Sequence, residues 1–332
     1  MLDILCIGDA KIDIFLQIKP GNPQVDLDKE KNKLQISFGE KIYVDKYVLG
    51  TGGNATNTAV GISRLGFNTG IVAEIGKDEF SGKILNNLKT ENVNTDCLLQ
   101  TDTEKSSFSI ILSYNAERTI FSEHVERDHN FNFENVKTRF VYITSLGKIW
   151  EKAYEKALEY VEKNNLKLAF NPGTLQIEKK GKVVMEIIER TDYLFVNKEE
   201  AEEILYGKEV SMGLNGTRAI EKLLYGLKSL GAKNVIITDS DNGSYLIDQE
   251  NNIYSIGIAP SNIVEKTGAG DSYTAGFLAA ILNGLSPGEA MIWGSINAAS
   301  VIQKVGAEEG LLTKDELEER IKEFNNFYPT KL

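Results

Sequence analysis

A short run of small residues followed by an acid indicates a site that handles phosphate. In residues 266–277, Gly268, Ala269 and Gly270 stand directly before Asp271, and an amphipathic helical pattern follows. The first N–H groups of a helix lack intrahelical partners and carry partial positive charge, so they attract anions. Glycines let a phosphate come close to such a backbone, and the carboxylate could take the proton of a hydroxyl that attacks phosphorus. The alternative is that Asp271 merely caps the helix.

A second glycine-rich turn, at residues 50–59, also leads into a helical pattern. Gly52 and Gly53 allow the backbone to lie close to a ligand, and Asn54 and Asn57 follow one helical turn apart. Their side-chain amides offer both donors and acceptors, which suit the hydroxyl groups of a sugar. The alternative for this turn is structural, with Asn54 as an ordinary helix N-cap.

The composition is that of an ordinary globular protein, and it narrows the class of partner. The chain has 332 residues, of which 42% are hydrophobic and 26% charged, with a formal net charge of −11. This acidity argues against a nucleic-acid partner, which requires a basic patch. No apolar run approaches the length of a membrane span, and the two cysteines form no disulfide framework. We therefore expect a cytoplasmic protein with a small-molecule substrate and no nucleic-acid or membrane partner.

Strand and helix patterns alternate along most of the chain and predict an α/β fold. The first strand is expected near 2–7, and helical patterns follow at 54–65 and 78–91. In the second half, strands are expected near 139–144, 166–170, 192–196 and 233–238, and helices at 151–164, 181–190, 198–206, 216–230, 271–283, 287–304 and 313–325. Such alternation is typical of a doubly wound, mostly parallel sheet flanked by helices on both faces.

Three segments do not fit that alternation. Residues 11–18, 34–49 and 106–122 predict a small antiparallel sheet that stands apart from the core, with a polar loop at 19–33. Beside a binding site such a sheet would serve as a lid, and the alternative is an edge extension without function. We expect one domain, residues 1–332, that includes this lid.

Two common nucleotide-binding signatures are absent from the sequence. The first strand runs into Gly8-Asp9-Ala10-Lys11 instead of a G-x-G-x-x-G turn, and no G-x-x-x-x-G-K-[ST] occurs. The two glycine clusters together resemble those of the ribokinase-like (PfkB) family of carbohydrate and nucleoside kinases, and the resemblance runs from residue 9 to about 312. Gly52-Gly53-Asn54-x-x-Asn57 resembles the family's sugar-binding turn. Thr267-Gly268-Ala269-Gly270-Asp271 with Gly276-Phe277 resembles its C-terminal signature.

The resemblance implies a kinase site built from both turns and from several strand ends. Asp271 would be the catalytic base, and the amides of Gly268, Ala269, Gly270 and Asp271 would form an anion hole for the transferring phosphoryl group. Substrate contacts are implied for Asp13, Gly52, Gly53, Asn54, Asn57 and His124, and the alternative for His124 is a histidine on the protein surface. Nucleotide contacts are implied for Asn197, Thr238, Ser240, Gly243, Thr267 and Asn297, with Glu200 near Mg²⁺. ATP and Mg²⁺ are the implied cofactors.

Three features beside these motifs leave alternatives open. Taken alone, Asn197 followed by Glu199 and Glu200 is typical of an ordinary helix start with Asn197 as its cap. Glu265 and Lys266 stand where the family usually has Asp-Thr, and in some members that Asp helps to hold a monovalent cation. K⁺ is therefore a candidate cofactor that the pattern leaves open. Ser240 stands where a glycine is usual at the nucleotide edge.

The resemblance implies ATP-dependent phosphorylation of a hydroxymethyl group on a sugar or sugar-like molecule. One alternative is a nucleoside (adenosine-type) kinase, which needs an apolar slot for the base from residues such as Phe15, Phe38, Tyr43 or Phe108. Another alternative is a catalytically inactive sugar-binding protein, against which the intact motifs argue. The resemblance also implies a homodimer that forms through the lid.

Overall fold

A mostly parallel sheet organises the described part of the chain. The structure is a computed structural model and describes residues 1–28, 30–31, 33–102, 105–115, 117–123, 125–207 and 216–332. Among these residues the main sheet has the strand order β17-β16-β15-β14-β13-β12-β11-β1-β6. Its strands are β1 (Leu2–Ile7), β6 (Thr69–Val72), β11 (Thr138–Thr144), β12 (Lys167–Asn171), β13 (Tyr193–Asn197), β14 (Asn234–Thr238), β15 (Ser244–Ile247), β16 (Ile253–Ile256) and β17 (Thr330–Lys331). Within this sheet, β6, β1, β11, β12, β13 and β14 pair in parallel with their neighbours. Strands β15, β16 and β17 then pair antiparallel at the β14 edge.

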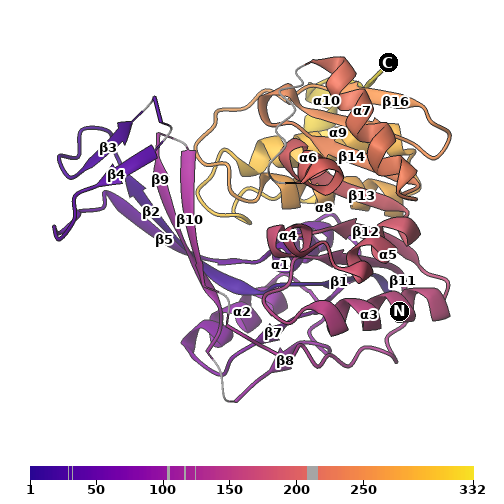
Figure 1. Cartoon of the computed structure of the whole chain (residues 1–332), viewed down its shortest axis with the longest axis horizontal. Coiled ribbons are helices and arrows are strands. Elements are labelled where there is room, and N and C mark those ends of the chain that lie inside the picture. The colour runs from indigo at the N-terminus through magenta and orange to yellow at the C-terminus, as the bar shows by residue number, and fades with distance from the viewer. Residues whose placement is uncertain (29, 32, 103–104, 116, 124, 208–215) are drawn as a thin grey trace.

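Helices cover both faces of this sheet (Figure 1). They are α1 (Asn54–Arg64), α2 (Glu79–Thr90), α3 (Glu151–Lys163), α4 (Thr174–Lys179), α5 (Lys182–Arg190), α6 (Lys198–Tyr206), α7 (Thr217–Ser229), α8 (Ala269–Leu282), α9 (Pro287–Val301) and α10 (Lys314–Glu323). Alternate residues of β1 are buried in two separate cores. Ile4 and Cys6 pack in the core that contains α1, α8 and α9. Leu5 and Ile7 pack in the core that contains α3, α5 and α7. Burial on both faces explains the nearly continuous apolar strands and confirms the doubly wound α/β fold. None of the helices in the described ranges is long and apolar enough to cross a membrane.

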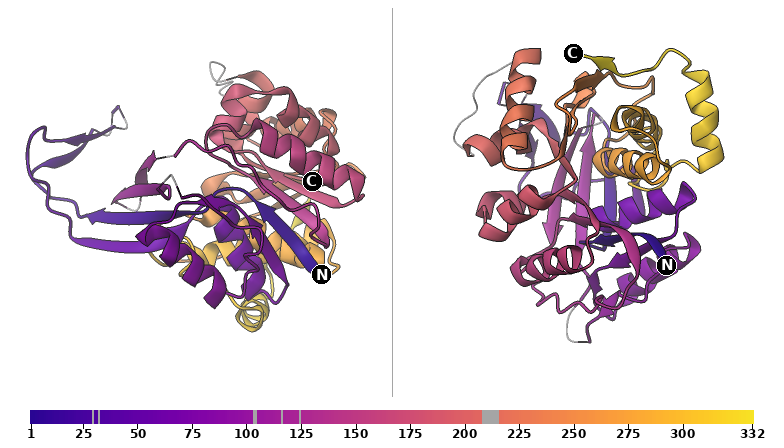
Figure 2. Two further views of the ribbon diagram at one scale, coloured as in Figure 1. Left: turned by 90° about the horizontal axis from the view of Figure 1, so that it is seen from below. Right: turned by 90° about the vertical axis from the view of Figure 1, so that its right-hand side faces the viewer.

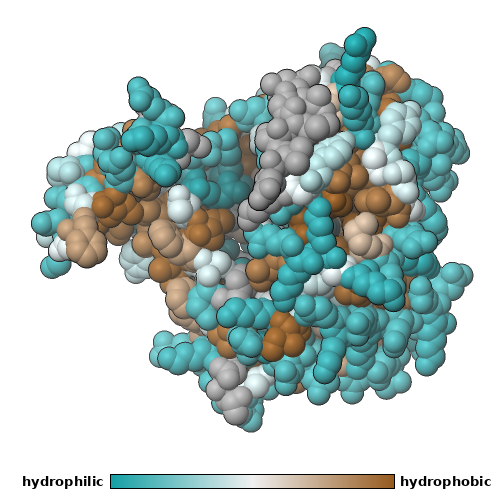
Figure 3. All heavy atoms as spheres, viewed as in Figure 1, coloured by the Kyte–Doolittle hydropathy of each residue, from teal (hydrophilic) through white to brown (hydrophobic). Residues whose placement is uncertain are grey.

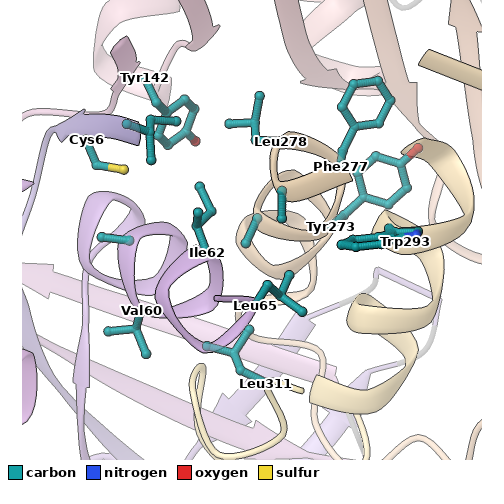
Figure 4. Packing of buried hydrophobic residues seen from close by; sticks show 14 of the residues in the cluster. Cys6, Val60, Ile62, Leu65, Tyr142, Tyr273, Phe277, Leu278, Trp293 and Leu311 are labelled. Carbon is teal, nitrogen blue, oxygen red and sulfur yellow. The ribbon is translucent and has the colours of Figure 1, made fainter. Parts of the chain in front are cut away.

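Helix α8 carries the glycine-acid segment and lies between α1 and α9 (Figure 4). Gly61 permits the close approach of α1, since a Cβ there would lie 2.7 Å from Cβ of Ala275. Gly276 permits the close approach of α9, since a Cβ there would lie 2.5 Å from the carbonyl oxygen of Trp293. Close packing on both sides therefore holds α8 in place and fixes the position of its first turn.

A second sheet, called the side sheet below, projects from the main body (Figures 1 and 2). Its strands, in the order β10-β9-β2-β5, are β10 (Glu117–Glu123), β9 (Phe108–Tyr114), β2 (Lys11–Ile18) and β5 (Lys46–Gly52). The segments 11–18 and 106–122 were expected to form such a sheet, and they do. A two-stranded pair of β7 (Glu74–Ile75) and β8 (Leu99–Gln100) lies at the edge of the main body.

The strand pairing around the side sheet differs from the expected antiparallel arrangement in two respects. Strand β2 pairs with β9 in parallel, because a crossover that includes α1, β6 and α2 returns the chain in the same direction. Within the segment 34–49, only the last part joins the side sheet, as β5. Strand β4 (Lys33–Ile36) pairs instead with β3 (Val25–Asp28), in the stretch expected to be a loop. A period of two identifies a strand, but it does not identify the partner of that strand.

Candidate active site

A cavity of about 500 Å³ lies between the side sheet and the carboxyl ends of the parallel strands. Asn171, Asn197 and Thr238, the last residues of β12, β13 and β14, line it from the main sheet. Lys11 and Asp13 of β2 line it from the side sheet. Ligands of doubly wound sheets bind at this edge, outside the carboxyl ends of the strands. The first turn of α8 forms a further part of the wall.

Asp271 lies inside the first turn of α8, so it does not serve as the helix cap. The helix begins at Ala269, and its N-cap residue is Gly268, which makes no side-chain cap hydrogen bond. Asp271 Oδ2 accepts a hydrogen bond of 2.8 Å from Nδ2 of Asn57 in α1. Because Asn57 also lines the cavity, the two glycine-rich turns meet at this carboxylate.

The surroundings of Asp271 hold its proton more tightly than water would. Burial, the largest effect, raises the pKa of Asp271 to about 7, and the nearby Asp13 charge raises it as well. The Asn57 hydrogen bond and the charges of Lys11 and Arg118 act in the opposite direction. A carboxyl group with a pKa near neutrality can accept and release a proton at ordinary pH, as a general base must.

The backbone before Asp271 requires a glycine. Gly268 has a φ of 81°, and a Cβ there would lie 2.8 Å from Cα of Ala307. A side chain at this position would therefore meet both backbone strain and a steric clash. The Ala269 N–H donates to the Lys266 carbonyl oxygen at 3.3 Å. The N–H groups of Gly270 and Asp271 have no backbone partner among the described residues, and both residues border the cavity, an arrangement suited to an anion.

The glycine-rich turn at residues 50–53 packs against Asp13. This carboxyl is only 5% exposed, and burial raises its pKa to about 6. A Cβ at Gly52 would lie 2.1 Å from Asp13 Oδ2, so glycine leaves room for the carboxyl group. Gly53 has a φ of 97° and is the N-cap of α1, which means that Asn54 is the first helical residue and not the cap. Asn54 lines the cavity together with Gly53.

Asn197 and Glu200 form a reciprocal cap at the start of α6. Asn197 Oδ1 accepts a hydrogen bond of 2.8 Å from the Glu200 N–H, and Glu200 Oε2 accepts one of 2.9 Å from the Asn197 N–H. Asn197 is therefore the helix cap that the motif alone predicts. Both residues also line the cavity, and burial raises the pKa of Glu200 to about 7.

Of the other residues for which the resemblance implies nucleotide contacts, not all line the cavity. Thr238, Ser240, Gly243 and Thr267 line it. Ser240 has a φ of 42°, in the left-handed region where glycine is free of strain, which accounts for the glycine that is usual there. Asn297 is fully buried and outside the lining: its Nδ2 donates to the Ser272 carbonyl oxygen and its Oδ1 accepts from the Leu312 N–H. His124 lies outside the described residues.

Several side-sheet residues that line the cavity were not singled out by the sequence. Lys11, Ser109 and Arg118 share the face of Asp13, and the Arg118 guanidinium makes no hydrogen bond or ion pair with any residue that the structure describes. Lys11 could have been found, since side chains two residues apart on a strand share a face. Arg118 could not, because its place depends on the pairing of β10 with β9.

The aromatic residues considered for a base slot do not line the cavity. Phe15 is fully buried, Phe38 is fully exposed, and Tyr43 is 71% exposed. Phe108 packs against Phe80 of α2, with ring centroids 6.2 Å apart. The apolar side chains that the side sheet presents to the cavity are those of Ile111 and Ile120.

Comparisons with known proteins agree with this geometry. Residues 20–314 match the family described as pfkB family carbohydrate kinase. The chain is 28% identical over 329 residues to a nucleoside kinase of Methanocaldococcus jannaschii, with 97% of each chain covered. It is 26% identical over 313 residues to a 5-dehydro-2-deoxygluconokinase of Geobacillus thermodenitrificans, with 89% of this chain and 90% of the relative covered.

Solved structures share the fold. The crystal structure of the Methanocaldococcus jannaschii nucleoside kinase superposes with a TM-score of 0.74 at 24% identity, covering 97% of this chain and 99% of the other. An Arabidopsis thaliana ribokinase in complex with ribose and ATP superposes with a TM-score of 0.75 at 19% identity, again covering 97% and 99%.

Proposed function

Because the chain belongs to the pfkB family of carbohydrate kinases, and thus to the phosphotransferases with an alcohol acceptor, we propose that it phosphorylates a hydroxymethyl group of a sugar or sugar-like molecule with ATP. The observation that carries the proposal is the position of Asp271. Its carboxyl group borders the cavity in the first turn of α8, with a pKa of about 7 and with Asp13 on the facing sheet.

Each part of the site has a task in this reaction. Asp13, Asn54 and Asn57 would bind the acceptor hydroxyls, and Asp271 would take the proton of the hydroxyl that attacks phosphorus. The amides at the start of α8 would bind the transferring group, whose negative charge they stabilise. The side sheet would act as a lid that excludes water, so that phosphate passes to the acceptor and not to water.

Mg²⁺ fits the nucleotide side through a single carboxyl group. No cluster of three or more acid, His or Cys side chains within the described ranges could hold a metal ion alone. Mg²⁺ commonly uses one or two carboxylates together with phosphate oxygens. Glu200 would serve here, directly or through water, with Asn197 holding it in place. When bound, Mg²⁺ neutralises phosphate charge.

Glu265 is the candidate ligand for a monovalent cation such as K⁺. It is 1% exposed, and its Oε1 accepts hydrogen bonds from the N–H and Oγ1 of Thr267. Its Oε2 is buried and has no hydrogen-bond partner among the described residues. A buried carboxyl oxygen without a hydrogen-bond donor is a suitable ligand for a cation.

The nucleoside kinase alternative rests on the Methanocaldococcus jannaschii relative. On the side sheet its base could lie against Ile111 and Ile120, and on the main body Phe195 and Tyr273 are aromatic residues of the lining. The Geobacillus relative instead bears the name of a sugar-acid kinase. Against an inactive binding protein stands the retention of Asp271, Asn197 and Glu200 at the cavity.

ADP release measured across a panel of sugars, sugar acids and nucleosides tests the proposal directly. With the best acceptor, we expect Asp271→Asn to lower turnover by about 10³-fold and to leave ATP affinity nearly unchanged. The pKa of Asp271 is higher in the folded protein than in the unfolded chain. At pH values above the unfolded pKa, this acid therefore lowers the free energy of unfolding. Asp271→Asn should therefore unfold at a higher temperature than the wild type at pH 8. Wild-type turnover in this variant would refute the base, and absence of ADP release with every acceptor would refute the kinase.

We further propose a cytoplasmic homodimer that assembles through the side sheet, with no nucleic-acid or membrane partner. Residues Leu49, Ile14, Ile110 and Phe121 lie side by side in register across its four strands, on the face opposite to Asp13. Phe121 is 54% exposed and Leu49 38%. Apolar surface gathers on the projecting part of the molecule (Figure 3), and such patches on soluble proteins often mark contacts with other proteins.

A further inference from the structure

A buried carboxyl group lies next to the glycine-rich turn at residues 50–53 and outside the cavity. Glu308, in the segment between α9 and α10, is 6% exposed. Its Oε2 accepts a hydrogen bond of 2.9 Å from Thr51 Oγ1 and one of 2.7 Å from Asn87 Nδ2. Its carbonyl oxygen accepts a third, of 2.8 Å, from Nη1 of Arg64. Glu308 thus joins the C-terminal part of the chain to β5, α1 and α2.

This carboxyl group is energetically expensive where it lies. Its Oε1 is buried without a hydrogen-bond partner in the described part of the chain. The guanidinium of Arg64 forms its ion pair with Glu91, and from there its charge still favours the ionised form of Glu308. Burial nevertheless raises the pKa of Glu308 to about 7. Burying an acid costs folding free energy that the two hydrogen bonds to Oε2 and the Arg64 charge only partly offset.

The partner Thr51 occupies a special position in the chain. In the stretch Gly50-Thr51-Gly52-Gly53, Thr51 is the only residue with a side chain beyond Cα. Gly50 is the register partner of Asp13, and Gly52 packs against its carboxyl group. Since side chains alternate along a strand, Thr51 points away from Asp13, and there it meets Glu308. Glycine backbone has more conformational freedom than that of other residues, so the Thr51 hydroxyl is the one side-chain group through which residues 50–53 can be held.

The residue before Glu308 contacts the other half of the site. Ala307 packs against Gly268, since a Cβ at Gly268 would lie 2.8 Å from Cα of Ala307. Gly268 is the N-cap of α8, which carries Asp271. Two consecutive residues therefore contact the helix start that holds the proposed base and the strand end that flanks Asp13.

From these contacts we propose that Glu308 is a positioning residue, which acts through Thr51 to fix the side sheet, and with it Asp13, relative to Asp271. The proposal rests on the proposed kinase function for its consequence in catalysis. Without this link the glycines around Thr51 would allow β5 to shift, the acceptor would lose its alignment, and water would enter the cavity. Transfer would fall while hydrolysis of ATP would rise.

Paired variants separate this role from general stability. Thr51→Val removes only the hydroxyl, whereas Thr51→Ser keeps it. Glu308→Ala removes the acceptor, whereas the amide oxygen of Glu308→Gln can still accept from Thr51 and Asn87. Asn87→Leu is the matched control, because it removes the other hydrogen bond to the same carboxyl oxygen and leaves the link to Thr51 intact.

The measurements are the acceptor KM and the ratio of ADP formed to acceptor phosphorylated. We expect Thr51→Val and Glu308→Ala to raise both about tenfold, in keeping with the sensitivity of transfer to small misplacements. Thr51→Ser, Glu308→Gln and Asn87→Leu should stay within about twofold of the wild type. Equal effects of Thr51→Val and Asn87→Leu, or equal damage by Glu308→Gln and Glu308→Ala, would overturn the proposal.

Hydrogen exchange of residues 46–52 without ligand gives a readout that does not depend on activity. Exchange there should be faster in Thr51→Val than in Asn87→Leu, and unchanged exchange would refute the restraint. If the wild type released no ADP with any acceptor, the proposed function would fail, while this comparison would still decide whether Glu308 holds the side sheet.

Discussion

Two carboxyl groups with raised pKa values line the cavity, Asp13 from the side sheet and Asp271 from α8. Asp271 has a pKa of about 7 and Asp13 a pKa of about 6, in both cases chiefly because of burial. The charge of Asp13 adds to the pKa of Asp271, while the charge of Arg118 subtracts from it. The pH at which the base ionises therefore depends on residues of the side sheet.

The pH profile of turnover tests this dependence. Asp271 must be ionised to accept a proton, so kcat should rise with pH through about 7 and be lost below it. Removing a like charge favours the carboxylate, so Asp13→Asn should move this acidic limb to lower pH. Removing an opposite charge disfavours it, so Arg118→Met should move the limb to higher pH. Asp192→Asn is the control, because Asp192 precedes β13 at the end opposite to Asn197 and does not line the cavity. Shifts of equal sign in Asp13→Asn and Arg118→Met would contradict the assignment.

At the scale of elements, glycines decide how closely the strand and helix ends beside the cavity pack against their neighbours. Gly268 brings α8 against Ala307, and Gly52 brings β5 against Asp13. Neither contact leaves room for a Cβ. The glycine-rich motifs thus act on both sides of the cavity, by allowing a helix start and a strand end to lie where larger residues would not fit.

Gly52→Ala tests the element contact on the substrate side. A Cβ there would lie 2.1 Å from Asp13 Oδ2, so the carboxyl group must move. We expect kcat/KM for the acceptor to fall by about 10²-fold. The affinity for ATP, measured by isothermal titration calorimetry, should stay unchanged. Gly82→Ala in α2 is the matched control, since a Cβ there meets nothing within 4 Å. An acceptor kcat/KM in Gly52→Ala equal to that of the control would show that the position of Asp13 does not matter.

At the scale of the whole molecule, the side sheet has two faces with different roles. One face lines the cavity with Lys11, Asp13, Ser109 and Arg118, whereas the other carries apolar side chains that include Leu49 and Phe121. A second copy of the chain could cover the apolar face without blocking the cavity. Dimer formation would then also restrain the lid.

Sedimentation equilibrium tests the proposed dimer. The wild type should sediment as a dimer, and Phe121→Lys should dissociate it because a charge would be buried in the contact. Tyr225→Lys, which also replaces an exposed aromatic residue but lies on α7, should remain dimeric. A monomeric wild type, or a dimeric Phe121→Lys, would rule out assembly through this face.

The sequence alone determined most of the elements and the two turns that build the site. The strand expected at 192–196 is Tyr193–Asn197, and the helix expected at 151–164 is Glu151–Lys163. These features follow from local periodicity and from glycines beside polar residues, which depend on near neighbours in the chain.

Tertiary structure decided what lies next to what. The parallel pairing of β2 with β9, the β3–β4 pair and the inward orientation of Asn297 depend on contacts between distant segments. The same holds for the hydrogen bond between Thr51 and Glu308, which are 257 residues apart. No local pattern marks such a pair, because burial and hydrogen-bond partners exist only once the chain has folded.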